Sequence, residues 1–362
     1  MYYSLPLWTD LCLKLAQTAA GLVNVRWEHI GDHELFQRIE FASGIYKGHY
    51  IIIAGGNRGN GIELKSAGIY DIDSGRHTEL PDLPENFNSS YCGGAVLNNY
   101  FYVYCLYFKE SMYRINLSKR QRWESVAGYL NENMKVIPMN DKIFSLSGYQ
   151  NTMYNPSTKH WVGLPLMNTP RQDFSLASLE GKIYAIGGHK LNEKKKLSSI
   201  EIFDSFSGTW HSGVSLPQSL AHVVAFVVEK WIIVAGGQDE NDKAINYPLI
   251  FDTERQKWFR STESLPSPRL YHALITTDEK VISIGGCPDN RNSIFSLETM
   301  SKRCLIPNLT TSDQLIKLRR LLEDERATII HDEKLNEGDK IVQKAVANLP
   351  DELFMHVLSF SI

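Results

Sequence analysis

The feature that most constrains the fold of this chain is a short apolar run that ends in two glycines and recurs along the sequence. Complete copies occupy residues 51–56, 183–188, 232–237 and 281–286. Degenerate copies end near Cys105 and Gly148. The copies follow one another at a mean spacing of about 46 residues, the size of one small supersecondary unit. Such a unit cannot bury its own faces, so its copies must stack on one another.

A second mark accompanies most copies: an aromatic residue and then a polar residue, seven positions before a tryptophan. It occurs as Tyr154-Asn155 before Trp161, Phe203-Asp204 before Trp210, and Phe251-Asp252 before Trp258. Tyr70-Asp71 keeps the spacing but is followed by His77 instead of tryptophan. Between these marks, short alternating strands are separated by Gly, Asn, Asp and Pro, which is typical of consecutive β-hairpins.

Each part of the repeat has a physical purpose. A wholly apolar run of this length is typical of a strand that is buried on both faces between stacked sheets. The terminal glycines let the backbone turn sharply and let neighbouring sheets approach closely. The tryptophan supplies a large rigid surface for packing between sheets. We therefore expect an all-β protein whose sheets stack radially or in a line.

The combination of these marks resembles the kelch repeat, and the resemblance covers about residues 27–305. It implies a six-bladed β-propeller with four-stranded antiparallel blades. The blades would be centred on Gly55, Cys105, Gly148, Gly187, Gly236 and Gly285. We place the propeller at 25–305, after an N-terminal segment (1–24) that can form a short helix.

Trp27 precedes Gly55 by 28 residues, close to the 26 that separate Trp161 from Gly187. It therefore stands where the fourth strand of a preceding blade would lie, although no blade precedes it. We expect the segment around Trp27 to complete blade six, because a ring closed with strands from both ends has no exposed sheet edge. The alternative interpretation is an ordinary surface-packed tryptophan.

After the repeats the periodicity becomes helical. Residues 306–347 carry leucines at helical spacing with charges on the opposite face, which predicts a charged helical linker, either a strut or a solvated tail. The final segment, 348–362, resembles the opening third of an F-box, the motif that docks a substrate receptor onto a ubiquitin-ligase adaptor. The residues that match, and that would bind the adaptor, are Leu349, Pro350, Leu353, Val357 and Leu358. A generic amphipathic helix is the alternative.

Composition narrows the class of partner. The chain has 38 Lys and Arg residues against 41 Asp and Glu, so it lacks the basic excess that nucleic-acid binding needs. No apolar stretch is long enough to span a membrane. Its five cysteines form no CxxC pair, which argues against a disulfide framework and a structural zinc site. With no signal peptide recognised, we expect a cytoplasmic or nuclear protein that is not secreted.

The sequence contains no recognisable catalytic constellation. HExxH, GxSxG and P-loop motifs are all missing, and the eleven histidines are scattered. We expect no catalytic residue, no metal and no cofactor. The alternative is a kelch-type enzyme, galactose-oxidase-like or related, or a binder of small ligands or carbohydrates.

What remains is binding to protein. The resemblance places two sets of loops on one face: those after the glycine pairs, and the segments that lead into each blade. The candidate partner-binding residues are Asn57, Arg58, His189, Gln238, Asp239, Arg171 and Arg269. The two arginines would suit an acidic or backbone-rich peptide, or would instead bond backbone carbonyls between blades. We therefore expect a protein-interaction scaffold, with substrate recognition for a ubiquitin ligase as its specific form.

Overall fold

The structure, a computed structural model, describes residues 28–31, 34–58, 62–89, 92–105, 112–126, 134–261, 264–265, 267–277, 280–286 and 297–301. All of them belong to one structural unit, Trp27–Ile306. These residues form strands and no helix, so none of them lies in a helix that could cross a membrane. The segments predicted at 1–24, 306–347 and 348–362 lie outside the described residues.

Six antiparallel sheets of four strands each, which we call blades, make up most of the fold. Blade 1 consists of β2 (Ala42–Tyr46), β3 (Tyr50–Ala54), β4 (Ala67–Asp71) and β5 (His77–Leu80). Blade 2 consists of β6 (Cys92–Leu97), β7 (Tyr100–Cys105), β8 (Met112–Asn116) and β9 (Trp123–Ser125). Blade 3 consists of β10 (Lys135–Met139), β11 (Lys142–Leu146), β12 (Asn151–Asn155) and β13 (His160–Leu164).

The remaining blades repeat this plan. Blade 4 consists of β15 (Ser175–Leu179), β16 (Lys182–Ile186), β18 (Ile200–Asp204) and β19 (Thr209–Ser212). Blade 5 consists of β20 (Val224–Val228), β21 (Trp231–Ala235), β22 (Leu249–Asp252) and β23 (Lys257–Arg260). Blade 6 consists of β24 (Ala273–Thr276), β25 (Lys280–Ile284), β26 (Leu297–Ser301) and β1 (Glu28–Gly31). A two-stranded sheet, β14 (Arg171–Gln172) with β17 (His189–Lys190), stands beside blade 4.

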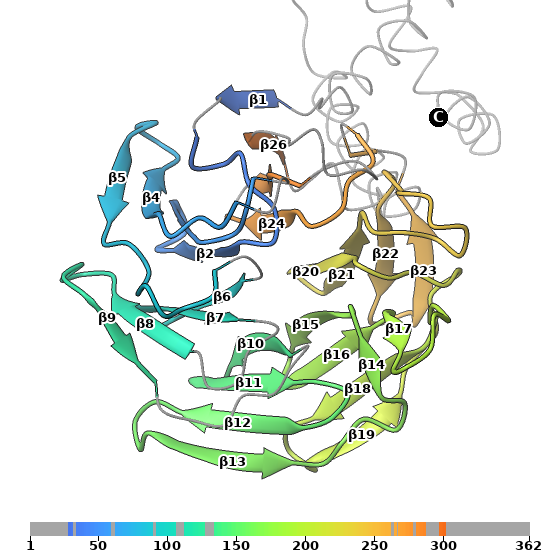
Figure 1. Cartoon of the computed structure of the whole chain (residues 1–362). Coiled ribbons are helices and arrows are strands. Elements are labelled where there is room, and N and C mark those ends of the chain that lie inside the picture. Colours follow the sequence, from blue (N-terminus) through green and yellow to red (C-terminus); the bar gives the residue numbers. More distant parts are fainter. Residues whose placement is uncertain are drawn as a thin grey trace, which may run out of the picture. The chain divides into compact units, whose positions relative to one another are not determined.

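The blades are arranged around a common axis, with the first strand of each blade innermost (Figure 1). Contacts between inner strands run from β2 to β6, β10, β15, β20 and β24, and from β24 back to β2. The predicted all-β propeller with four-stranded antiparallel blades is therefore confirmed.

The ring is closed by strands from opposite ends of the propeller sequence. Strand β1 pairs antiparallel with β26, with Glu28 opposite Thr299 and His29 opposite Glu298. The closing strand thus begins just after Trp27, which itself lies outside the described residues. Because β1 covers the outer edge of β26, blade 6 has the same four strands as the other blades.

The second strand of blade 1 shows why the repeated run is apolar at every position. Ile51 and Ile53 pack in a cluster with residues of blade 6, such as Ile282. Ile52 and Ala54 point the other way, into a cluster with Phe101 and other residues of blade 2. Alternate side chains of one strand therefore fill two different inter-blade cores, as the sequence indicated.

The seven-residue spacing has a structural cause as well. Phe203 on β18 is directly opposite Trp210 on β19, and their ring centroids are 5.3 Å apart. Asp204 then accepts hydrogen bonds from the backbone N–H groups of Phe206 and Ser207, at 2.8 and 3.2 Å, and so closes the hairpin turn. The pattern therefore encodes an aromatic cross-strand pair joined by an Asx turn.

Three tryptophans also tie their blade to the one before it. Trp210 Nε1 donates a hydrogen bond of 2.9 Å to the carbonyl oxygen of Pro165, just past the last strand of blade 3. Trp123 and Trp258 make the same kind of bond to Pro81 and Val214.

Candidate functional site

The two sets of loops expected at one face do meet there. We call the residues just before the inner strand of each blade its lead-in segment. In blade 4, the lead-in strand β14 pairs with β17, which directly follows the glycine pair. Single β-bridges make the corresponding link in blade 1, from Ile39 to Asn57, and in blade 5, from Ala221 to Gln238. Lead-in segments and post-glycine loops therefore form one face of the propeller.

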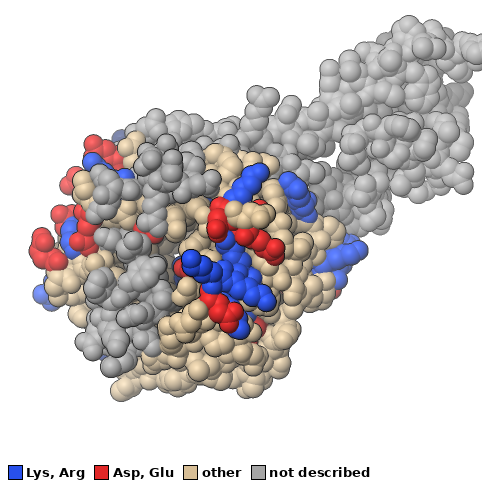
Figure 2. Space-filling model, turned by 45° about the vertical axis from the view of Figure 1, so that its right-hand side comes forward, with Lys and Arg blue, Asp and Glu red and all other residues tan. Residues whose placement is uncertain are grey.

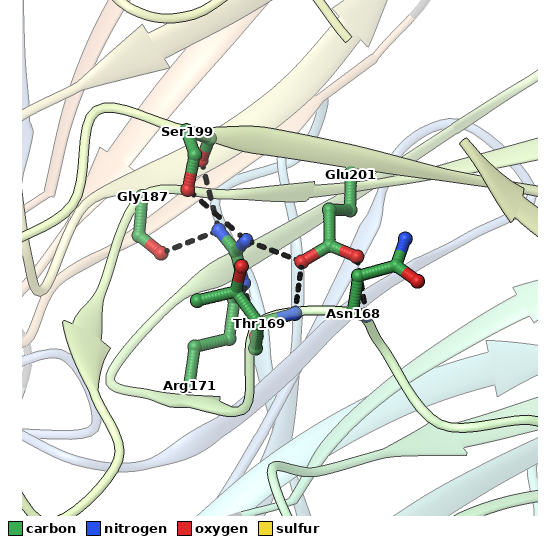
Figure 3. Close-up of polar contacts among 6 residues, drawn as sticks. All are labelled: Asn168, Thr169, Arg171, Gly187, Ser199 and Glu201. Carbon is green, nitrogen blue, oxygen red and sulfur yellow. Dashed lines mark hydrogen bonds and ion pairs between the residues drawn. The ribbon is translucent and has the colours of Figure 1, made fainter. Parts of the chain in front are cut away.

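Arg171 is not exposed on this face; its guanidinium group is directed at Gly187, Ser199 and Glu201 (Figure 3). Its side chain is fully buried. Nη1 donates to the carbonyl oxygens of Gly187 and Ser199, at 3.1 and 2.8 Å, and Nη2 donates to Glu201 Oε1 at 2.8 Å. The arginine thus ties the lead-in segment to the glycine pair and to strand β18 of its own blade.

Arg269 and Arg38 are buried in the equivalent places of blades 6 and 1. Arg269 Nη1 donates to Ser283 Oγ at 2.8 Å. Arg38 Nη1 donates to the carbonyl oxygens of Gly55 and Ser66, at 2.8 and 3.2 Å, in the same pattern as Arg171. Because a buried guanidinium cannot reach a partner, the interpretation of Arg171 and Arg269 as partner-binding residues is corrected. The alternative, bonds to backbone carbonyls between blades, differs from the structure as well: Arg171 bonds carbonyl oxygens of its own blade, and Arg269 bonds the hydroxyl groups of Ser283 and Ser267.

Glycine is required at both positions of the pair because lead-in segments pass very close to its backbone. Gly187 and Gly188 have φ angles of 61° and 92°, in the left-handed region. A Cβ on Gly187 would collide with the carbonyl oxygen of Leu220, in the lead-in segment of blade 5. A Cβ on Gly188 would collide with the carbonyl oxygen of Gln172, in its own lead-in segment. The lack of a side chain at Gly187 therefore leaves room for the lead-in segment of blade 5, and at Gly188 it leaves room for the lead-in segment of blade 4.

Two positions before the inner strand, four lead-in segments place a left-handed residue with a functional side chain. The φ angles are 57° at Glu40, 54° at Asp173, 56° at His222 and 53° at Tyr271. Residues other than glycine rarely adopt this conformation, and it persists only where the surroundings hold it. Because this backbone conformation recurs in four blades, the fold fixes the direction in which the four side chains leave the backbone.

With Lys135, the first residue of the inner strand of blade 3, these four residues form a cluster that we call the axial ring. Glu40 donates its N–H to Tyr271 O at 3.4 Å, and the rings of Tyr271 and His222 have centroids 5.2 Å apart. His222 donates its N–H to Asp173 O at 2.9 Å. Burial lowers the pKa of Lys135, and the negative charges of Asp173 and Glu40 oppose that shift, so the ammonium group belongs to the same electrostatic cluster. All five side chains are half-buried.

Within the axial ring, Asp173 also joins two histidines. Its Oδ2 is 3.2 Å from His189 Nδ1, and its Oδ1 is 3.8 Å from His222 Nδ1. Burial alone would raise the pKa of the Asp173 carboxyl, but the hydrogen bond with His189 and the nearby charge of Lys135 hold that pKa below its usual value. Burial lowers the pKa of His222 to about 4, although Asp173 opposes the shift. At neutral pH, a carboxylate therefore faces an uncharged His222 imidazole.

The other predicted residues are distributed around this centre. Asn57 is buried and donates from Nδ2 to Glu40 Oε2 at 3.0 Å, so it positions a member of the axial ring. Arg58 is exposed and pairs with Glu34. Gln238 and Asp239 are half-exposed, and Asp239 accepts backbone N–H bonds from Asn241 and Lys243 within its own loop. The adaptor-binding candidates Leu349, Pro350, Leu353, Val357 and Leu358 lie outside the described residues.

Charge on the visible surface is mixed. Figure 2 shows Lys and Arg side chains beside Asp and Glu side chains on one side of the propeller, rather than a broad area of one sign. This agrees with the near balance of the composition, 38 Lys and Arg against 41 Asp and Glu.

Comparison with known proteins agrees with the geometry of blade 4. The Kelch motif family matches residues 170–217, which run from the lead-in segment of this blade past its last strand. The chain is a β-propeller with a kelch motif in blade 4. The family match therefore covers Arg171, both glycines of its pair and Trp210, the residues to which the structure gives inter-strand and inter-blade roles.

Curated relatives extend the similarity of this kelch-repeat protein beyond blade 4. Rat Kelch-like protein 36 is 26% identical over 156 residues, which cover 42% of this chain and 25% of the relative. Mouse Kelch-like protein 35 is 24% identical over 175 residues, covering 46% of the chain and 30% of the relative. Mouse Kelch-like protein 11 is 24% identical over 268 residues, which cover 71% of this chain and 32% of the relative. The chain thus matches about a quarter to a third of the length of these relatives.

Proposed function

We propose that this kelch-repeat propeller is a protein-interaction scaffold that binds a segment of a partner protein at the axial ring. The observation that carries the proposal is the convergence of half-buried Glu40, Lys135, Asp173, His222 and Tyr271 from five blades. Polar groups held rigidly on one face of a scaffold are suited to binding. The similarity to Kelch-like proteins supports the same class of function.

The chemistry of the axial ring favours a polar, extended segment. Lys135 offers a cation to a partner carboxylate, while Glu40 offers an anion to a partner ammonium or guanidinium group. Tyr271 adds a phenol that can donate or accept a hydrogen bond. A preference for acidic peptides, which would have needed exposed Arg171 and Arg269, is not part of the proposal because both side chains are buried.

Site-specific photo-crosslinking tests this proposal. A photoreactive residue would replace Tyr271 in one variant and Phe206 in a matched control. Phe206 is 87% exposed and lies in the β18–β19 turn, at the opposite end of blade 4 from its glycine pair. We expect a co-purifying partner to crosslink from position 271 and not from position 206. Crosslinking from position 206 alone would overturn the assignment of the binding face.

The more specific proposal is that the chain recognises substrates for a ubiquitin ligase, in the cytoplasm or nucleus. It rests on the resemblance of residues 348–362 to the opening of an F-box. Under this proposal, the full chain co-purifies with the F-box adaptor, and the double variant Leu353→Asp, Val357→Asp does not. A wild-type chain that never captures the adaptor would leave the scaffold proposal without the ligase role.

A further inference from the structure

We propose that Asp173, His189 and His222 form a binding site for a first-row divalent metal ion such as Zn²⁺, with a coordination position left for solvent or for a partner's side chain. The sequence offered no sign of this site, because its residues are spread over fifty positions and belong to no metal-binding motif. The inference goes beyond the scaffold proposal and does not depend on it.

The distances suit a metal ion. One ligand atom from each of the three residues can be chosen so that all lie within 4.8 Å of one another. In a tetrahedral zinc site, with ligands at about 2.0–2.2 Å from the metal, neighbouring ligand atoms are about 3.3–3.6 Å apart. Asp173 Oδ2 is 3.2 Å from His189 Nδ1, close to this value, and the second oxygen of the same carboxylate, Oδ1, is 3.8 Å from His222 Nδ1. Small rotations of the side chains would complete the geometry.

The backbone holds the three residues in place. Gln172, next to Asp173, pairs with His189 across the β14–β17 sheet. His222 comes from blade 5 and donates its N–H to the carbonyl oxygen of Asp173 at 2.9 Å. Asp173 and His222 both occupy left-handed backbone conformations that aim their side chains. A preformed set of ligands of this kind binds a metal without large reorganisation of the chain.

The ligand types and their exposure point to the class of ion. Two imidazoles and one carboxylate are typical ligands of zinc and of other first-row divalent metals, and sites with only three protein ligands keep a position open. The three side chains are 16%, 20% and 23% exposed, so an ion could enter and a further ligand could reach it. Lys135 opposes the ion through its positive charge, which weakens the site without removing it.

Isothermal titration of the purified, untagged full chain with Zn²⁺ tests the proposal. We expect one ion per chain, and an affinity about tenfold or more weaker in His189→Ala and in His222→Ala. His211→Ala is the matched control, because His211 lies exposed on β19, away from the lead-in segments, and its loss should leave the affinity unchanged. Lys135→Met should bind Zn²⁺ more tightly, because the opposing charge is gone.

Three results of these titrations would overturn the proposal. No stoichiometric binding by the wild-type chain overturns the proposal, as does unchanged affinity in both histidine variants or weaker binding by Lys135→Met. Thermal melting of each variant shows that it is folded, and His222→Gln replaces His222→Ala if the latter melts early. Because no partner protein is present in the titration, failure here leaves the scaffold proposal standing.

Discussion

Nη2 of Arg171 donates to Oε1 of Glu201 at 2.8 Å, and both side chains are withdrawn from solvent. The carboxylate also accepts the backbone N–H groups of Asn168 and Thr169, at 2.6 and 2.9 Å. All three of these donors come from the segment that leads into blade 4. This buried pair fixes the lead-in segment on which Asp173 of the axial ring is carried.

Breaking the pair should be costly. Arg171→Ala leaves the Glu201 carboxylate buried without its cation, and we expect a loss of about 3–5 kcal/mol in the free energy of unfolding. Lys230→Ala is the control, because its ion pair with Glu254 is largely exposed and should contribute no more than about 1 kcal/mol. Urea denaturation measures both. Similar small losses in the two variants would show that the buried pair is not important for stability.

The hydrogen bond from Trp210 to blade 3 can be separated from its packing. Trp210→Phe removes the Nε1 donor but keeps an aromatic ring against Phe203, so we expect a loss of about 1 kcal/mol. Trp210→Ala removes the ring as well and should lose about 3–5 kcal/mol. Thermal or urea denaturation compares the two. Equal losses would mean that the hydrogen bond, rather than the ring, joins the blades.

His272 makes the propeller sensitive to acid. It is buried, neither ring nitrogen has a hydrogen-bond partner among the residues that the structure describes, and burial together with the charge of Arg269 lowers its pKa to about 3. Between about pH 6.5 and pH 3 the unfolded chain binds a proton that the folded chain does not, so stability falls as pH drops through this window. Above about pH 6.5 this group adds no pH dependence.

His272→Phe should remove most of this dependence. Phe41 and Phe174 occupy the same place in blades 1 and 4, three residues after Arg38 and Arg171, so the fold accommodates phenylalanine there. The measurement is the unfolding free energy at pH 7.5 and pH 5. We expect a smaller difference in the variant than in the wild type, with some remaining because burial also lowers the pKa of His222. An unchanged difference would show that another group is responsible.

Closure of the ring depends on β1. Deleting residues 1–31 removes this strand and exposes the outer edge of β26, so we expect a lower melting temperature and aggregation. The deletion stops before Leu35, which is buried in the core between blades 6 and 1. Deleting residues 1–24 keeps β1 and is the control. If both truncated chains melt alike, β1 does not close the ring.

The sequence predicted the blades because each one carries its own local marks. Phe203, Asp204 and Trp210 form one hairpin within eight residues, so their pattern can be recognised without knowledge of the rest of the chain. The apolar runs were equally informative, because a strand between two cores must be apolar at consecutive positions. Repetition then indicated how such units assemble.

The sequence did not predict which side chains the fold would bury or bring together. Pro-Arg in a loop suggested exposed arginines, although Arg171 and Arg269 are buried. Arg38 was missed because glutamine replaces proline before it. The axial ring was missed because four of its five members share a backbone position rather than a chemistry. Aligning each blade at two residues before the inner strand would have found four of its five residues, but this requires strand boundaries to within one residue.

The central claim is that buried arginines hold the lead-in segments while the axial ring binds the partner, and one experiment tests it most directly. The melting temperature and the partner's Kd would be measured for Arg171→Ala with Arg269→Ala, and for Glu40→Gln with Tyr271→Asn, where asparagine suits the left-handed backbone. The first double variant should melt earlier and, while folded, bind normally. The second should melt near the wild-type temperature and bind about tenfold or more weakly. Weak binding by an arginine variant of unchanged melting temperature would contradict the claim.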